Sequence, residues 1–241
     1  MRISRILGKI QHVHCGVCLP QAWVVSPKLK YAGSVDLIGA ALNEFNSGYR
    51  HAGLIFFDRK TKTRRLLHLA DHYKFKNEVP GATYRIFPND NFSFGEAEFL
   101  AERAQRLWDV NGAKIAYGLD YQGEVVFDEN MKFVDEDGLG LTCATFLLAF
   151  FDRCGFPIAE INSWLPRAND AIFQESIFNY LRPHLNKEQF ERAKNAVGKA
   201  PRYRPEEVVA CFSHYDDKPS SFQNAQVWGC AVLRESKMKI W

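Results

Sequence analysis

The chain has 241 residues and a formal net charge of +3, with 46% hydrophobic and 24% charged residues. This balance is typical of a globular protein, and so small a positive excess gives no reason to expect binding to nucleic acid or to a membrane surface. No stretch approaches the ~20 apolar residues that span a bilayer, so we expect no transmembrane segment.

The N-terminal residues and the cysteines bear on the cellular compartment. The start, MRISRILGKIQHVHCG, carries basic residues but no long apolar run, so no secretory signal is evident. Six cysteines without an export signal are more typical of thiols than of a disulfide framework. We therefore expect a cytoplasmic protein, with an effector exported by a signal-independent route as the alternative.

In chain order, the sequence first predicts an extended segment and then a helix. Residues 10–26 are strand-like or extended. Ser34 is placed to cap a helix that ends at Gly48. The apolar residues that would share one face of this helix are Leu37, Ile38, Ala41, Leu42 and Phe45.

Strand patterns follow. Residues 51–57 (HAGLIFF) and 64–70 (RRLLHLA) flank a basic turn, which predicts an antiparallel hairpin, and 82–88 (ATYRIFP) is a further strand. Alternation along the strands places His51 with Gly53, Ile55 and Phe57, and His68 with Leu66 and Ala70. A cross-strand contact between the two histidines is therefore possible.

Helical patterns dominate the rest of the chain. Ser93 and Glu96 have capping-box spacing, and the helix that they begin ends at the Asn-Gly pair 111–112. The later predicted elements are a short strand GEVVFDE within the loop 113–140, a helix over about 142–154, two helices in 169–200 capped near Asn169 and Asn186, a short helix PEEVVACF, and a final strand AQVWGCAVL (225–233). Segregated helices and hairpins predict an α+β fold with a mainly antiparallel sheet, in one domain over residues 1–241.

Cys143 stands where glycines give way to an apolar helix, in GLGLTCATFLLAFFDRCGFP (138–157). In the first turn of a helix, unpaired N–H groups and the helix dipole favour the thiolate and lower its pKa from ~8.5. A nucleophilic thiol also needs a base, usually histidine, and a third polar group that orients the imidazole. The competing interpretation is a small core residue, which also suits Cys154 further along the helix.

His51 and His68 supply the missing partners. A histidine on an apolar strand face is more often structural than catalytic. Two on neighbouring strands, followed by a cysteine at a helix start, favour a functional site. Ala52 and Gly53 are small enough to leave room for a neighbouring helix end.

The order of HAGLI, a second strand with histidine, YGLD (117–120) and TCATFLLAFFDRCGFP resembles the circularly permuted papain-like superfamily. This is the permuted NlpC-type group of cysteine peptidases and amidases, with lecithin:retinol acyltransferase-like and deSUMOylating-isopeptidase-like relatives. The resemblance covers residues 48–157, with a weaker echo at 203–212. It implies an antiparallel sheet packed against the helix that begins at the nucleophile, with residues 158–241 as a helical extension and final strand.

The resemblance also implies roles for individual residues. Cys143 matches the nucleophile, His51 the basic histidine, and His68 the third polar residue. After a register change, His72 or Asp71 would take the third position.

Other positions near the cysteine carry weaker expectations. Many relatives have Asn or a similar polar residue before the cysteine, whereas Thr142 stands here. The backbone N–H of Cys143 is one expected oxyanion donor, and the sequence does not identify the second. Tyr117 is a candidate for lining the substrate cleft, or equally a packing residue.

The expected function is therefore a cysteine hydrolase that cleaves an amide bond through an acyl-enzyme on Cys143, without a cofactor. The substrate would be a peptide, a peptidoglycan-type peptide or an isopeptide. One alternative is a lipid acyltransferase or phospholipase that uses the same Cys–His pair. The other is a catalytically silent binding domain of the same fold.

A metal site is a weaker interpretation. HVHCGVC (12–18) and CFSH (211–214) each contain cysteine and histidine, and together they would offer enough ligands for zinc. A single C-x-x-C such as Cys15/Cys18 has little specificity, and nothing in the sequence brings the two segments together. We therefore expect ordinary thiols and no metal.

Overall fold

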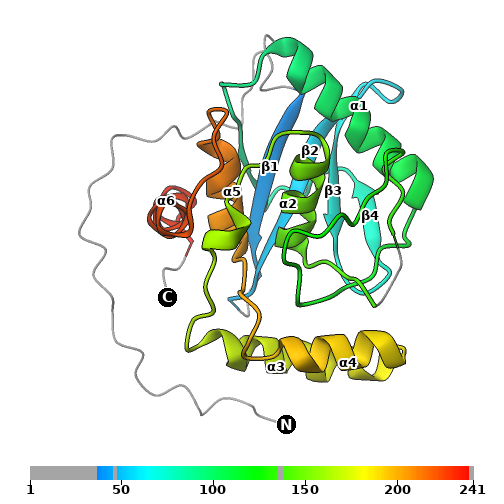
Figure 1. Ribbon diagram of the computed structural model, residues 1–241. Coiled ribbons are helices and arrows are strands. Elements are labelled where there is room, and N and C mark those ends of the chain that lie inside the picture. Colours follow the sequence, from blue (N-terminus) through cyan, green and yellow to red (C-terminus); the bar gives the residue numbers. More distant parts are fainter. Residues whose placement is uncertain (1–36, 46–47, 135–137, 239–241) are drawn as a thin grey trace.

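The computed structural model describes residues 37–45, 48–134 and 138–238, and an antiparallel sheet lies at its centre (Figure 1). The strand order is β4-β3-β2-β1-β5. The strands are β1 (Ile38–Glu44), β2 (Arg50–Asp58), β3 (Thr63–Leu69), β4 (Phe75–Glu78) and β5 (Arg85–Phe87). The α-helices are α1 (Phe94–Asn111), α2 (Cys143–Arg153), α3 (Asp170–Leu181), α4 (Lys187–Ala196), α5 (Pro205–Ser213) and α6 (Phe222–Glu235). The predicted α+β class is confirmed.

β1 is a strand where the sequence predicted a helix ending at Gly48. It lies between β2 and β5, and both of its faces are buried. Ile38 and Leu42 join the main core, whereas Ala41 packs on the other face with Ile55 and Leu66. A strand covered on both sides carries a nearly continuous apolar run, and here that run imitated a helical stripe. Ser34 and residues 10–26 lie outside the described residues.

The predicted hairpin of β2 and β3 is confirmed, with Asp58 opposite Thr63 next to the turn. β5 confirms part of the strand predicted over 82–88. β4 was not predicted, because its sequence, FKNE, is short and mostly polar. The predicted strand GEVVFDE is wrong, since only an isolated bridge between Phe127 and Phe133 forms in that region.

The main core lies between one face of the sheet and helices α1, α2 and α5. The Ser93–Glu96 capping box begins α1 as predicted, and Ala97, Leu100, Ala101, Ala104 and Leu107 are buried along it. α2 is buried on almost every side, which explains why its sequence is apolar all round. The predicted helices at 142–154, in 169–200 and at PEEVVACF are confirmed by α2, α3, α4 and α5.

The final strand predicted over 225–233 is wrong, because this segment belongs to α6. Val and Trp favour strands, but the buried residues of α6 recur at helical spacing: Phe222, Ala225, Gly229, Val232 and Leu233. Ser221 caps the helix by accepting a hydrogen bond from the backbone N–H of Asn224. Helical periodicity and packing on α5 therefore outweigh the local strand preference.

The helices α3 and α4 lie across the end of the sheet at which β2 begins (Figure 1). On α3, the ring of Phe173 packs on Tyr49 with centroids 5.9 Å apart, and the hydroxyl of Tyr180 donates to Asp71 at 2.8 Å. On α4, the side chain of Gln189 donates to the hydroxyl of Tyr73 at 3.0 Å. Helices α3 and α4, which follow the β2–β3 hairpin and α2 in the sequence, therefore cover one end of the sheet.

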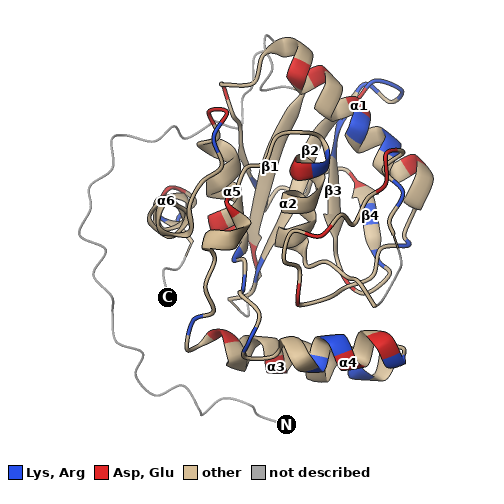
Figure 2. Cartoon of the chain, in the orientation of Figure 1, with Lys and Arg blue, Asp and Glu red and all other residues tan. Residues whose placement is uncertain are grey.

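Charges of both signs occur along helices α1 and α4. Lys and Arg alternate with Asp and Glu along α1 and α4, while the strands are largely uncharged (Figure 2). None of the described helices is long and apolar enough to cross a membrane.

Gly118 and Gly140 are in close contact just before α2 begins, and this contact gives a first prediction. A Cβ at Gly140 would lie 2.6 Å from the backbone N of Gly118 and 2.6 Å from the carbonyl C of Tyr117. Gly140→Ala should therefore lower the free energy of unfolding by about 2–3 kcal/mol, measured by urea denaturation. The matched control is Gly95→Ala, where a Cβ meets nothing within 4 Å. Equal stabilities of the two variants would contradict the close approach.

Candidate active site

Cys143 is the first residue of α2, and a capping box fixes the helix start there. The side chain of Thr142 accepts a hydrogen bond from the N–H of Thr145 at 3.1 Å, and the hydroxyl of Thr145 accepts one from the N–H of Thr142 at 2.7 Å. Thr142 is therefore the N-cap. The backbone N–H groups of Cys143 and Ala144 stabilise the thiolate form of Cys143, which opposes a rise of its pKa.

A further N–H reaches the thiol from β2. The N–H of Phe57 bonds to Leu37 on the β1 side, so alternation turns the N–H of Ala52 toward β3. The ladder between β2 and β3 ends at Leu54 and Leu67, before it reaches Ala52. The Ala52 N–H is thus left over by the sheet, and it stabilises the thiolate of Cys143. Sequence analysis could not find this donor, because it depends on where the ladder ends.

Burial decides the resting state of the thiol. Cys143 is 6% exposed. Burial raises the pKa of its thiol to about 11, against the opposing effects of the N–H groups of Ala52, Ala144 and Cys143 and the charge of Arg202. The expectation that the helix start lowers this pKa is therefore wrong for the substrate-free site, since loss of hydration outweighs the N–H groups.

His51 and His68 are joined directly. Nε2 of His51 lies 2.6 Å from Nδ1 of His68, and Nε2 of His68 lies 3.0 Å from Oε1 of Glu78. The Glu78 carboxylate can only accept, so His68 carries its proton on Nε2 and accepts through Nδ1. His51 must then donate from Nε2, which leaves the lone pair on its Nδ1. The hydrogen bonds that run from Glu78 through His68 thereby hold His51 in the tautomer whose Nδ1 can accept a proton.

Both imidazoles are neutral in this arrangement. Burial, followed by the repulsion that a protonated His68 would exert and by the positive charge of Lys76, lowers the pKa of His51 to about 3. Burial also lowers the pKa of His68, and Glu78 only partly opposes it. The resting pair is therefore a neutral thiol and a neutral imidazole, not an ion pair.

Cys143 meets the sheet at the backbone N–H of Ala52, beyond the end of the β2–β3 ladder. Alternation puts His51 and His68 on the sheet face of Ile55 and Leu66, whereas α2 packs on the opposite face. Cys143 contacts the Ala52 amide, which is bonded to the carbonyl carbon of His51. Among the described residues, no hydrogen bond joins Sγ to His51. Such bonds often form only when substrate binds.

Tyr84 and Tyr117 lie close enough to Cys143 for its charge to raise the pKa of their hydroxyl groups. The ring of Tyr84 is edge-on to His68 at 6.4 Å, and its pKa is raised to about 12 by burial, then Glu78, then Cys143. Burial and then Cys143 raise the pKa of Tyr117 above its usual range. Tyr117, the residue expected to line the cleft, is thus near the nucleophile.

The other two candidates for the third position have different partners. Nδ1 of His72 accepts a hydrogen bond from the backbone N–H of Tyr117 at 3.1 Å. The carboxylate of Asp71 accepts from Lys74 at 2.7 Å and from Tyr180 at 2.8 Å. The structure brings His68, rather than either of these, to His51.

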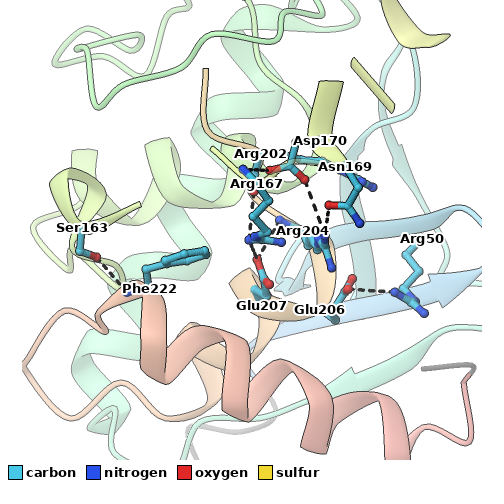
Figure 3. A network of polar contacts seen from close by, with 10 residues as sticks. All are labelled: Arg50, Ser163, Arg167, Asn169, Asp170, Arg202, Arg204, Glu206, Glu207 and Phe222. Carbon is cyan, nitrogen blue, oxygen red and sulfur yellow. Dashed lines mark hydrogen bonds and ion pairs between the residues drawn. The ribbon is translucent and has the colours of Figure 1, made fainter. Parts of the chain in front are cut away.

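A network of ion pairs holds the start of β2 (Figure 3). Arg50, which precedes His51, donates to Glu206 at 2.8 Å, and Arg167 donates to Glu207 at 2.7 Å. Both carboxylates lie in the first turn of α5, where the helix dipole also favours negative charge. β2 is thereby tied to α5 next to the histidine.

The described residues hold no group of three or more His, Cys, Asp or Glu side chains placed for a metal ion. Cys15 and Cys18 lie outside the described residues. Cys211 is fully buried, and the ring of His214 stacks on Trp228 at 4.5 Å. Cys211 and His214 are thus part of the packing of α5 and α6.

Comparisons of the chain with protein-family models, curated proteins and solved structures gave no match. The resemblance to permuted papain-like enzymes therefore rests on the sequence motifs alone.

The neutral resting pair predicts the pH dependence of alkylation. The thiolate is the attacking species, and the pKa of Cys143 is about 11. Its rate constant with iodoacetamide, followed by mass spectrometry, should therefore rise about tenfold per pH unit up to about pH 10. In the urea-denatured control the rate should level off above about pH 8.5. A plateau below neutral pH in the folded protein would show a resting thiolate and contradict the effect of burial.

Proposed function

We propose that this protein is a cysteine hydrolase that cleaves amide bonds, with a permuted papain-like arrangement of its site. The observation that carries the proposal is the hydrogen-bonded series Glu78–His68–His51, which leaves a lone pair on Nδ1 of the residue that precedes Ala52, the contact of Cys143. The chain order supports it, because the histidine strand precedes the cysteine helix as in the permuted group. Peptides, peptidoglycan-type peptides and isopeptides are the proposed substrate classes.

In the acylation step, Sγ of Cys143 attacks the carbonyl carbon of the amide while Nδ1 of His51 takes the thiol proton. The tetrahedral intermediate collapses as His51 passes this proton to the leaving nitrogen. The amine departs, and an acyl thioester remains on Cys143. His51 then takes a proton from water, whose oxygen attacks the thioester, and returns it to the sulfur as the carboxylic acid leaves.

The two charges of the first step arise together, which suits a buried site. Thiolate and imidazolium each lose hydration, but side by side they attract strongly in low dielectric. The imidazolium keeps its Nε2 bond to His68, and the carboxylate of Glu78 lies on the far side of that ring. His68 and Glu78 are thus positioning residues that also offset the positive charge.

Backbone N–H groups stabilise the negative charge that develops in the reaction. The N–H of Cys143 is one donor for the oxyanion, and we assign the Ala52 N–H as the second. Both also stabilise the thiolate of Cys143. When the sulfur bonds to the carbonyl carbon, the negative charge moves from the sulfur to the oxygen of the tetrahedral intermediate, and these donors are then available to that oxygen.

The test is acylation by 4-nitrophenyl acetate, followed by peptide 4-nitroanilides of varied sequence. We expect an acetyl thioester on Cys143 by mass spectrometry and none in Cys143→Ala. Glu78→Gln should slow acylation about 10- to 100-fold, because an amide can donate to His68 and reverse both tautomers. The matched control is Glu98→Gln, a surface residue paired with Arg59. Acylation on another residue, or equal rates in both Gln variants, would contradict the mechanism.

A further inference from the structure

Arg202 lies in the segment between α4 and α5 and is one of the residues of the network in Figure 3. Its guanidinium carbon is 3.4 Å from the centroid of the Phe173 ring, and Phe173 in turn packs on Tyr49. Tyr49 is two residues before His51 and directly precedes β2. This aromatic stack fixes a half-buried cation next to the start of β2.

The acidic residues around Arg202 are engaged elsewhere. Glu206 binds Arg50, Glu207 binds Arg167, and Asp170 accepts from the backbone N–H of Arg167 and pairs with Arg204. Only the backbone carbonyl of Arg202 is bonded, to Arg167. Within the described parts of the chain its guanidinium makes no hydrogen bond or ion pair, so its N–H donors remain available.

The positive charge of Arg202 also affects the ionisation of Cys143, the proposed nucleophile. Its positive charge lowers the pKa of both the Cys143 thiol and the Tyr117 hydroxyl. Burial and the neighbouring Arg204 lower its own pKa to about 10, so it is protonated at neutral pH. Burial of this cation costs free energy that the negative charges of Asp170 and Glu206 offset only in part, and an anionic ligand would offset more of it.

We propose that Arg202 recognises a carboxylate of the substrate close to the scissile amide bond, so that it determines specificity. This role rests on the proposed hydrolase function. The planar guanidinium fits a carboxylate through two parallel hydrogen bonds. A carboxylate is preferred to a phosphate dianion because Asp170 and Glu206 already place negative charge near Arg202. The substrate class is therefore an amide of an acidic amino acid or of a residue with a free carboxylate.

The test compares two reagents that react at the same carbon but differ in charge, iodoacetate and iodoacetamide. At about pH 8 the rate constants for Cys143 are measured by mass spectrometry, and the half-buried thiol of Cys230 on α6 is the reference in the same sample. The ratio of the two rates cancels any change in thiol pKa. We expect Arg202→Met to lower the iodoacetate-to-iodoacetamide ratio at Cys143 about tenfold and to leave the ratio at Cys230 unchanged.

The control is Lys199→Gln, which removes an exposed positive charge three residues away and should leave both ratios unchanged. Arg202→Gln replaces Arg202→Met if circular dichroism shows that the latter does not fold. If iodoacetamide labels Cys143 but the ratio does not depend on Arg202, the carboxylate role is overturned and the hydrolase proposal stands. If neither reagent labels Cys143, the hydrolase proposal falls, and the role of Arg202 with it.

Discussion

The hydrogen bond between His51 and His68, 2.6 Å long and buried between neighbouring strands, is the interaction on which the proposed site depends. Two neutral imidazoles can form it in either direction, and each direction gives His51 a different tautomer. Glu78 selects one direction, because a carboxylate only accepts. A single acidic side chain on the strand beyond β3 thereby decides which nitrogen of His51 faces away as a base. Gly53 makes room for this arrangement, since a Cβ there would lie 3.1 Å from Cβ of His68.

Burial and backbone N–H groups act against each other around the nucleophile. Burial favours the neutral thiol and the neutral imidazole, while the N–H groups of Ala52, Ala144 and Cys143 favour the thiolate. The balance keeps the thiol and the imidazole uncharged. In the proposed reaction, negative charge develops on the substrate carbonyl, and the Ala52 N–H beyond the end of the β2–β3 ladder stabilises it.

The sequence predicted the parts of the structure that depend on residues close together in the chain. The hairpin turn, the Ser93–Glu96 capping box and the start of α2 at Cys143 depend on residues close in sequence, and all were predicted. β1 was not, because burial on both faces erased its alternation. α6 was not, because packing on α5 overrode strand propensity. Glu78 and Arg202 carried no sequence signal. One lies on a short polar edge strand that was not predicted, and the other becomes significant only through its position next to Phe173 and Cys143.

The most direct test of the account is the tautomeric state of His51, read from imidazole ¹⁵N–¹H correlation spectra of the ¹⁵N-histidine-labelled protein. Spectra of His51→Gln and His68→Gln would assign the two rings. At neutral pH we predict a proton on Nε2 and a lone pair on Nδ1 in both rings, and His51 should remain neutral down to about pH 4, since its pKa is about 3. A proton on Nδ1 of His51, or an imidazolium at neutral pH, would contradict the orientation of the base by His68 and Glu78.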